Sequence, residues 1–257
     1  TGAVDSITTG DYNVGVGDSA GGEITTGVRN TALGFNALGA NITGSHNTAI
    51  GQSALAGTTA SYNTATGYQS LYLNTTGTEN VAVGRYALRA NTTANYNTAV
   101  GTNALDVNTT GSNNTATGSN ALGSNTTGAN NTATGYQALY DNTTGAENVA
   151  IGKYALANNT TASYNVAVGN GSLQTNTTGT NNTASGYRSL YSNTTGGYNV
   201  AVGLNALYSN TTGANNVAIG RSAGNNITTG SSNIIIGYNI DAPSATASNQ
   251  LNIGGWI

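Results

Sequence analysis

The chain has 257 residues, with 9 acidic and 6 basic side chains, 37 glycines and no cysteine. The lack of cysteine excludes a disulfide framework and a thiolate metal site, and so few basic residues exclude the continuous positive stripe of a nucleic-acid-binding surface. The net charge of −3 and the frequent β-branched residues argue against disorder. No run of about 18 apolar residues is present, so we expect no insertion into a membrane.

Residues 1–12 are interpreted as a partial coil, and residues 13–232 as a tandem repeat in which one motif returns at every seventeenth position. The units begin with Asn-(Thr/Val)-Ala-x-Gly, with Gly15 in place of alanine in the first of them. Every interval equals this period except the one from Asn47 to Asn63, which is shorter by a single position. Residues 63–130 match residues 131–198 unit for unit, which indicates that a block of four units was duplicated. The units start at Asn13, Asn30, Asn47, Asn63, Asn80, Asn97, Asn114, Asn131, Asn148, Asn165, Asn182, Asn199 and Asn216, with a variant at Asn233.

Each unit is predicted to contain a short strand, as in residues 80–84. Side chains alternate along a strand, so Val81 and Val83 face one way and Ala82 the other. The constant small residue indicates that Ala82 and its equivalents point into a narrow interior. A second short strand is expected at the Ala-Leu pair, where Leu88 would pack against the alanines and give a flattened coil with two sheets.

The fold class predicted from this pattern is all-β, a parallel β-roll or β-solenoid of about thirteen stacked coils. At about 4.8 Å between stacked strands the coils would extend over roughly 60 Å. Asn and Thr are expected to form ladders along the axis. The glycines, including those of the closing Asn-Thr-Thr-Gly sequence, are expected to supply positive φ at the corners.

The outward strand positions carry valine or isoleucine in several coils. If this face met water it would form a large exposed apolar patch, which monomeric proteins avoid. We therefore expect self-association, with three such faces meeting on one axis. The predicted interface residues are Val81, Val83, Val149, Ile151, Val166, Val168, Val200, Val202, Val217 and Ile219.

Tyrosine is the one excess that suggests a ligand. Two repeat positions carry it several times, and rows of aromatic rings can stack on sugar rings or pack against the coil corners. Both interpretations stay open, and the candidate ligand-binding residues are Tyr72, Tyr140, Tyr191 and Tyr208 at one position and Tyr68, Tyr136 and Tyr187 at the other.

Catalytic machinery is not expected. His46 is the only histidine, which leaves no Ser-His-Asp triad and no histidine-based metal site. Paired carboxylates for glycoside hydrolysis are not evident in neighbouring coils. We expect no enzyme activity, no cofactor and no metal.

The Asn-Val-Ala-Val-Gly and Asn-Val-Ala-Ile-Gly strands, each followed by Ala-Leu and a glycine corner, resemble the head repeats of YadA-type trimeric autotransporter adhesins over roughly residues 7–237. The resemblance implies a left-handed parallel β-roll assembled as a homotrimer. Family repeats are usually shorter, so the Asn-Thr-Thr corner looks like an insertion and ligand-binding details do not carry over.

Residues 233–257, with Pro243 and Trp256, are interpreted as a cap or junction. The end of this segment, residues 248–257, resembles the sequence that precedes a cleavable endosialidase-type chaperone domain in phage tail fibres. The resemblance implies a mature product from which a chaperone has been released.

Three functions follow as expectations. The first is a rigid trimeric fibre or adhesin segment, on a virion or a bacterial surface, that binds a host glycan or protein receptor. The second is an ice-binding solenoid that uses Thr-x-Thr strands, and the third is a structural spacer without a ligand. The Thr-x-Thr pairs are Thr64 and Thr66, Thr115 and Thr117, and Thr132 and Thr134.

Overall fold

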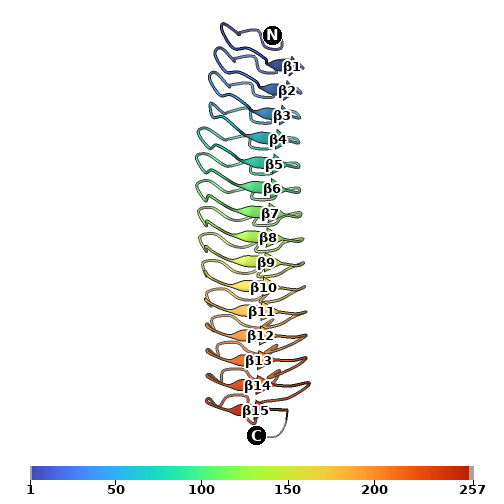
Figure 1. Ribbon diagram of the computed structural model, residues 1–257, viewed down its shortest axis with the longest axis vertical. Helices are drawn as coiled ribbons and strands as arrows, with labels where there is room; N and C mark the ends of the chain where they lie inside the picture. The colour runs from blue at the N-terminus through green and yellow to red at the C-terminus, as the bar shows by residue number, and fades with distance from the viewer. Residues whose placement is uncertain (1, 255–257) are drawn as a thin grey trace. The chain divides into compact units, whose positions relative to one another are not determined.

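The computed structural model describes residues 2–254, all of them in strands, turns or irregular segments without a helix. The chain divides into two units, Thr1–Asn130 and Asn131–Ile257, and each is a parallel β-solenoid (Figure 1). The first unit contains β1 (Val14–Val16), β2 (Thr31–Leu33), β3 (Thr48–Ile50), β4 (Thr64–Thr66), β5 (Val81–Val83), β6 (Thr98–Val100) and β7 (Thr115–Thr117). The second contains β8 (Thr132–Thr134), β9 (Val149–Ile151), β10 (Val166–Val168), β11 (Thr183–Ser185), β12 (Val200–Val202), β13 (Val217–Ile219), β14 (Ile234–Ile236) and β15 (Leu251–Ile253).

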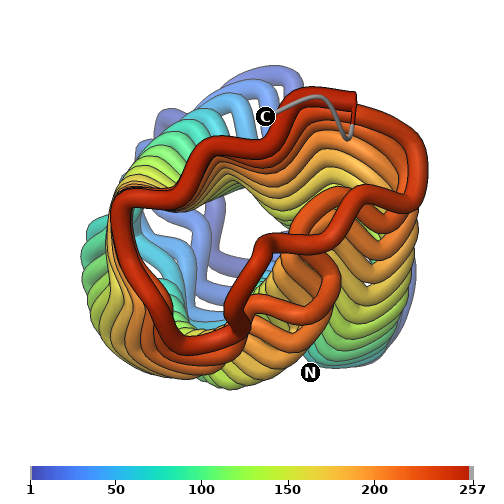
Figure 2. Tube along the Cα trace, turned by 90° about the horizontal axis from the view of Figure 1, so that it is seen from below, coloured from blue at the N-terminus to red at the C-terminus, as the bar shows by residue number. Residues whose placement is uncertain are grey.

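Within each unit every strand pairs in parallel with the strand of the next coil, and equivalent residues lie opposite one another. Ala65 pairs with Ala82 in the first unit, and Ala167 pairs with Ala184 in the second. The predicted repeat register and the predicted solenoid are therefore confirmed. The end-on view shows the coils of each unit following one another along the same irregular outline (Figure 2).

The shortened coil that begins at Asn47 keeps this register, since Thr48 still lies opposite Thr64. The missing residue belongs to the Asn-Thr-Thr corner. Thr58 occupies the buried place that asparagine holds in most other coils, and its Oγ1 accepts a hydrogen bond from Asn74 Nδ2 at 3.1 Å. The corner thus absorbs a deletion without loss of the inter-coil contact.

The interior of the coil is filled by alanine and leucine, as predicted. Ala82 and Leu88 are completely buried, and so are the equivalent residues of most other coils. A small and a large side chain from each coil are buried with the same pair of the next coil and fill a narrow core.

The prediction of a second strand at the Ala-Leu pair is wrong. The segment is a turn in which Leu88 has φ of 51° and Tyr86 has φ of 60°, both left-handed. The backbone of this turn still bonds along the stack, because the Leu88 amide donates to the Ala104 carbonyl at 3.0 Å. Each coil therefore contributes one strand and a series of tight turns, and the flattened coil with two sheets does not form.

The predicted asparagine ladders are present, and there are two of them. In the first ladder, the side chain of the asparagine that begins each coil accepts a hydrogen bond from the backbone amide of the asparagine that begins the next coil. Asn97 N, for example, donates to Asn80 Oδ1 at 2.9 Å. In the second, at the Asn-Thr-Thr corner, Asn91 Nδ2 donates to Asn74 Oδ1 at 2.8 Å. The second ladder ends in the second unit at Asn210, whose Oδ1 has no donor because the next coil carries Ile227.

The glycines serve two different purposes. The glycine that follows each strand has a positive φ, as expected, and Gly169 has φ of 132°. Gly179 of an Asn-Thr-Thr-Gly corner does not, so the prediction fails for the closing glycines. There a Cβ would lie 2.3 Å from the Gly196 carbonyl oxygen of the next coil, so close approach of two backbones, rather than positive φ, favours glycine.

Candidate interaction surfaces

The outward face of the strands lies where the sequence places it. In β5 the side chains of Val81 and Val83 are each 37% exposed while Ala82 is buried. The other predicted interface residues share this outward position, and the more exposed of them include Ile151, Val202 and Ile219. All the predicted residues thus lie on the outer sheet face.

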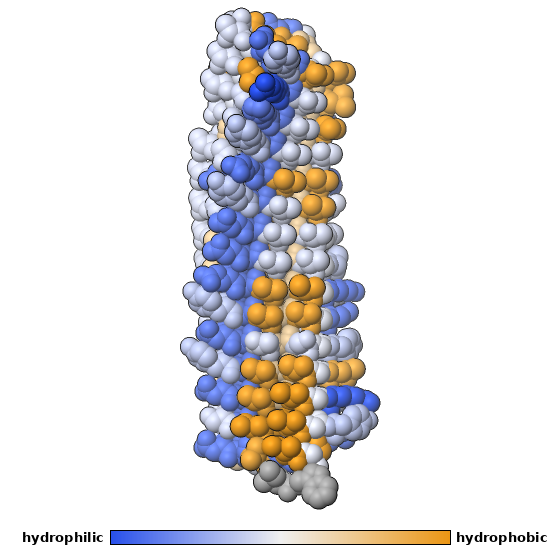
Figure 3. All heavy atoms as spheres, viewed as in Figure 1, coloured by the Kyte–Doolittle hydropathy of each residue, from blue (hydrophilic) through white to orange (hydrophobic). Residues whose placement is uncertain are grey.

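The longest uninterrupted apolar part of this face is in the second unit, from β12 to β15. Four consecutive strands present two apolar side chains each, and Figure 3 shows them as paired orange columns. We call these residues the apolar strip: Val200, Val202, Val217, Ile219, Ile234, Ile236, Leu251 and Ile253.

The last four residues of the apolar strip were not among the predicted interface residues. They belong to residues 233–254, which continue the stack as β14 and β15, while Trp256 lies outside the described residues. The signal was present in the sequence, because Val217, Ile234 and Leu251 follow one another at the period of the repeat.

The Thr-x-Thr strands also face outward, but they do not form a continuous ladder. In the first unit β4 and β7 are separated by β5 and β6, which carry valine. In the second unit β8 is followed by β9 and β10, which carry valine and isoleucine. Threonine and aliphatic strands therefore alternate along the same face.

The predicted tyrosines lie on the edge of the coil that follows the strand. Tyr68, Tyr136 and Tyr187 come directly after the strand-ending glycine and are exposed. Tyr72, Tyr140, Tyr191 and Tyr208 lie further round the coil and are half-buried. The structure brings Tyr191 and Tyr208 together as parallel rings with centroids 5.2 Å apart.

A third set of tyrosines was missed by the sequence analysis. It occupies the position immediately before the asparagine that begins a coil, at the opposite end of the strand. Tyr198 of this set is 62% exposed, more than any of the predicted tyrosines. Counting tyrosines by repeat position would have found the set, which consists of Tyr12, Tyr62, Tyr96, Tyr164 and Tyr198.

His46 belongs to the same position, and its ring stacks on Tyr62 with centroids 5.0 Å apart. Beside this pair Tyr62, Glu79 and Val81 line an open depression. This is a shallow feature of the outer surface, and Glu79 is the single carboxylate among these lining residues.

Every basic residue of the sequence lies over a tyrosine ring. Arg29 lies over Tyr12, Arg85 and Arg89 over Tyr86, Lys153 over Tyr136 and Tyr154, Arg188 over Tyr187 and Tyr191, and Arg221 over Tyr238. A cation over an aromatic face is attracted by the ring quadrupole. These pairs hold the basic side chains against the surface while their charge stays accessible.

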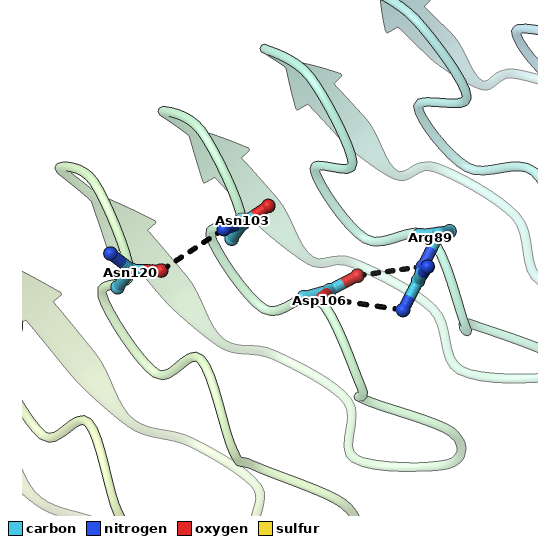
Figure 4. A network of polar contacts seen from close by, with 4 residues as sticks. All are labelled: Arg89, Asn103, Asp106 and Asn120. Carbon is cyan, nitrogen blue, oxygen red and sulfur yellow. Dashed lines mark hydrogen bonds and ion pairs between the residues drawn. The ribbon is translucent and has the colours of Figure 1, made fainter.

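One basic residue also has a carboxylate partner. Arg89 Nε lies 2.9 Å from Asp106 Oδ1 of the next coil (Figure 4). Burial raises the pKa of the Asp106 carboxyl above its ordinary value, and the nearby Arg89 opposes this rise. Figure 4 also shows Asn103 Nδ2 donating to Asn120 Oδ1 at 3.2 Å, so polar contacts between coils continue on this outer edge.

Comparison with protein-family models, with curated proteins and with solved structures finds no match. Within residues 2–254, no group of three or more histidine, aspartate or glutamate side chains is arranged to hold a metal ion. The same residues contain no helix of the length and apolar character needed to cross a bilayer.

Proposed function

We propose that this chain is a segment of a rigid extracellular fibre, on a virion or a bacterial surface, that assembles as a homotrimer and presents its edges to surface glycans. The observation that carries the proposal is the apolar strip. Its eight aliphatic side chains stand in two columns on consecutive strands, and Val202 and Ile219 are about two-fifths exposed. Exposed aliphatic surface that continues over several elements is typical of an interface.

A second copy of the chain is the partner that fits this strip best. The side chains repeat with the spacing of the coils, about 4.8 Å, so a matching partner needs the same period. An identical chain has it automatically, and closed symmetry is the usual form of self-association. Three copies, rather than two, are proposed on the resemblance to the YadA-type head repeats.

The extracellular location rests on the same resemblance and on the similarity of residues 248–257 to a fibre junction. The fold supports it indirectly. A narrow solenoid whose interior is filled by alanine and leucine offers long outer faces, and recognition on these faces is what we propose. Surface tyrosines on both edges of the sheet face are suited to sugar rings, whose apolar faces stack on aromatic side chains.

Two matched variants test the interface. Val202→Lys with Ile219→Glu places opposite charges in the apolar strip, and Thr212→Lys with Thr229→Glu places the same charges in the same two coils at an exposed corner. We expect the first variant to sediment as a monomer and the second as the wild-type trimer. Equal masses for the two variants would contradict the proposed interface.

A further inference from the structure

The charges of the chain are unevenly distributed between the two units. Six of the nine acidic residues precede residue 131. Residues 148–240 contain Lys153, Arg188 and Arg221 and no acidic residue at all. The overall charge of −3 therefore conceals a long segment of the second unit that is purely positive.

The three basic residues follow alternate strands along one edge of the stack. Lys153 comes directly after the glycine that ends β9, Arg188 follows one residue later after β11, and Arg221 comes directly after the glycine that ends β13. All three side chains are exposed. Two coil steps separate neighbours, which corresponds to about 9–10 Å along the stack.

Tyrosine rings accompany each of these charges. Lys153 Nζ lies 4.8 Å from the centre of the Tyr154 ring and 5.8 Å from that of Tyr136. The Arg221 guanidinium lies 5.3 Å from the centre of the Tyr238 ring and donates from Nη1 to the tyrosine Oη at 3.1 Å. Each contact limits the freedom of a long side chain without cancelling its charge.

Arg188, the middle one of the three basic residues, is accompanied by more aromatic rings than Lys153 or Arg221. The Arg188 guanidinium lies 5.1 Å from the centre of the Tyr187 ring and 5.2 Å from that of Tyr191, which in turn stacks on Tyr208. The preceding coil has Gly171 at the position of Arg188, where a Cβ would make an ordinary van der Waals contact with Arg188 Cγ at 3.4 Å. No larger side chain therefore stands beside the arginine at this position of the preceding coil.

A guanidinium that lies over a ring still has N–H groups that can donate to a carboxylate. The neighbouring tyrosines supply flat apolar surfaces for the sugar rings between the charges. The spacing is far too wide for nucleic acid, where about one charge occurs every 1.7 Å. It is close to the length of a disaccharide in an extended polysaccharide.

We propose that the second unit binds an extended acidic polysaccharide that carries one carboxylate in each disaccharide, with successive carboxylates on Lys153, Arg188 and Arg221. The proposal rests on the proposed glycan-binding fibre and names the ligand class that the fibre recognises. The polysaccharide runs along the stack, parallel to the apolar strip and beside it.

Measuring how tightly the purified chain binds to immobilised polysaccharides tests this proposal. The probes are hyaluronan, unsulfated chondroitin and heparosan, which all carry one glucuronate in each disaccharide, together with carboxyl-reduced hyaluronan. We expect binding to at least one of the acidic polymers that weakens with added salt, and no binding to the carboxyl-reduced polymer. Arg188→Gln with Arg221→Gln is expected to weaken binding at least tenfold.

Arg29→Gln with Arg85→Gln is the matched control, since it removes the same charge from two arginines that also lie over tyrosine rings, but in the first unit. It is expected to change binding less than twofold. Binding to none of the acidic polymers, equal binding of the carboxyl-reduced polymer, equal loss in both variants, or equally tight binding to double-stranded DNA would each overturn the proposal.

The same samples separate this proposal from the proposed fibre. A trimer by sedimentation that binds no acidic polysaccharide keeps the fibre and overturns the ligand class. A monomer that binds through Arg188 and Arg221 supports the ligand class and contradicts the trimeric fibre.

Discussion

Asn159 Nδ2 donates to Asn142 Oδ1 of the preceding coil at 2.9 Å, and the same nitrogen donates to the Ala162 carbonyl of its own corner at 3.0 Å. Asn176 Nδ2 then donates to Asn159 Oδ1 at 2.9 Å. One buried side chain therefore joins three consecutive coils and closes its own turn. Repetition of this arrangement gives a chain with very few charges a set of specific contacts between neighbouring coils.

Replacing Asn159 with alanine is expected to lower the free energy of unfolding by about 1–3 kcal/mol or more, since partners in two coils lose a buried hydrogen bond. Chemical denaturation followed by circular dichroism measures this. Thr161→Ala, at an exposed position of the same corner, is the control and should have little effect. Similar denaturation midpoints for the two variants would show that the ladder contributes little.

The two kinds of glycine are expected to respond differently to alanine. At Gly169 alanine would meet both a strained backbone with φ of 132°, which costs on the order of 1–3 kcal/mol, and the Gly186 oxygen 2.4 Å from its Cβ. At Gly179, in the same coil, a Cβ would lie equally close to a backbone oxygen, at 2.3 Å, but the backbone is not left-handed. Because the equivalent positions of other coils hold Ala94 and Ala162, the corner can relieve this close approach. Thermal unfolding should therefore show a much larger loss for Gly169→Ala; an equal loss would contradict the distinction.

The stability of the second unit is expected to depend on Asp141. Burial raises the pKa of this carboxyl above its ordinary value of 3.8, so the folded state favours the protonated form. The resulting stabilisation is fully present below the ordinary pKa and is lost as pH rises through the folded pKa. Asp141→Asn should flatten this decline and raise stability at neutral pH, and the next coil already has Asn158 at the equivalent position.

Unfolding midpoints measured from acid to neutral pH test the effect of Asp141. Burial also raises the pKa of Asp106, which remains in the variant. The unfolding midpoint of the variant should therefore still fall as pH rises, but less steeply than in the wild type. Identical pH profiles for the variant and the wild type would exclude a contribution from Asp141.

The pair Arg89 and Asp106 yields a prediction in the first unit. Arg89→Gln removes the cation that opposes the effect of burial, so the pKa of the Asp106 carboxyl should rise further. Titration of this carboxyl by NMR measures the shift. Arg85→Gln should raise the same pKa less, because its influence on Asp106 is smaller; an unchanged pKa in Arg89→Gln would contradict the pairing.

Ice recrystallisation is expected to proceed normally in the presence of the chain. Thr-x-Thr strands such as β4 and β7 are separated by strands with outward valine, which interrupts any regular array of hydroxyls. Inhibition of recrystallisation, strengthened by Val81→Thr with Val83→Thr, would instead favour the ice-binding function.

Much of the fold could be predicted because the repeat fixes the register. Once Asn80 and Asn97 are equivalent, the buried Ala82, the outward Val81 and the asparagine ladder follow from strand alternation and stacking. The turn at Leu88 could not be predicted in this way. Leucine disfavours left-handed backbone, and only the contacts with neighbouring coils, which a local pattern does not contain, stabilise it there.

The candidate surfaces were predicted less completely. The tyrosine columns at Tyr68 and Tyr72 were visible as repeats, but the exposure of Tyr198 and the placement of Arg188 between two rings depend on how the turns project their side chains. The turn geometry was the part of the coil that the sequence analysis had wrong. Only the small number of basic residues was considered from the sequence, whereas the three between residues 148 and 240 follow alternate strands along one edge.

The mass of the purified chain in solution, measured by sedimentation equilibrium at micromolar concentration, tests the central claim most directly. The apolar strip is proposed to be covered by copies of the same chain, so three chain masses are expected, without a detectable monomer. A single chain mass under these conditions would leave the strip in water and contradict the trimeric fibre.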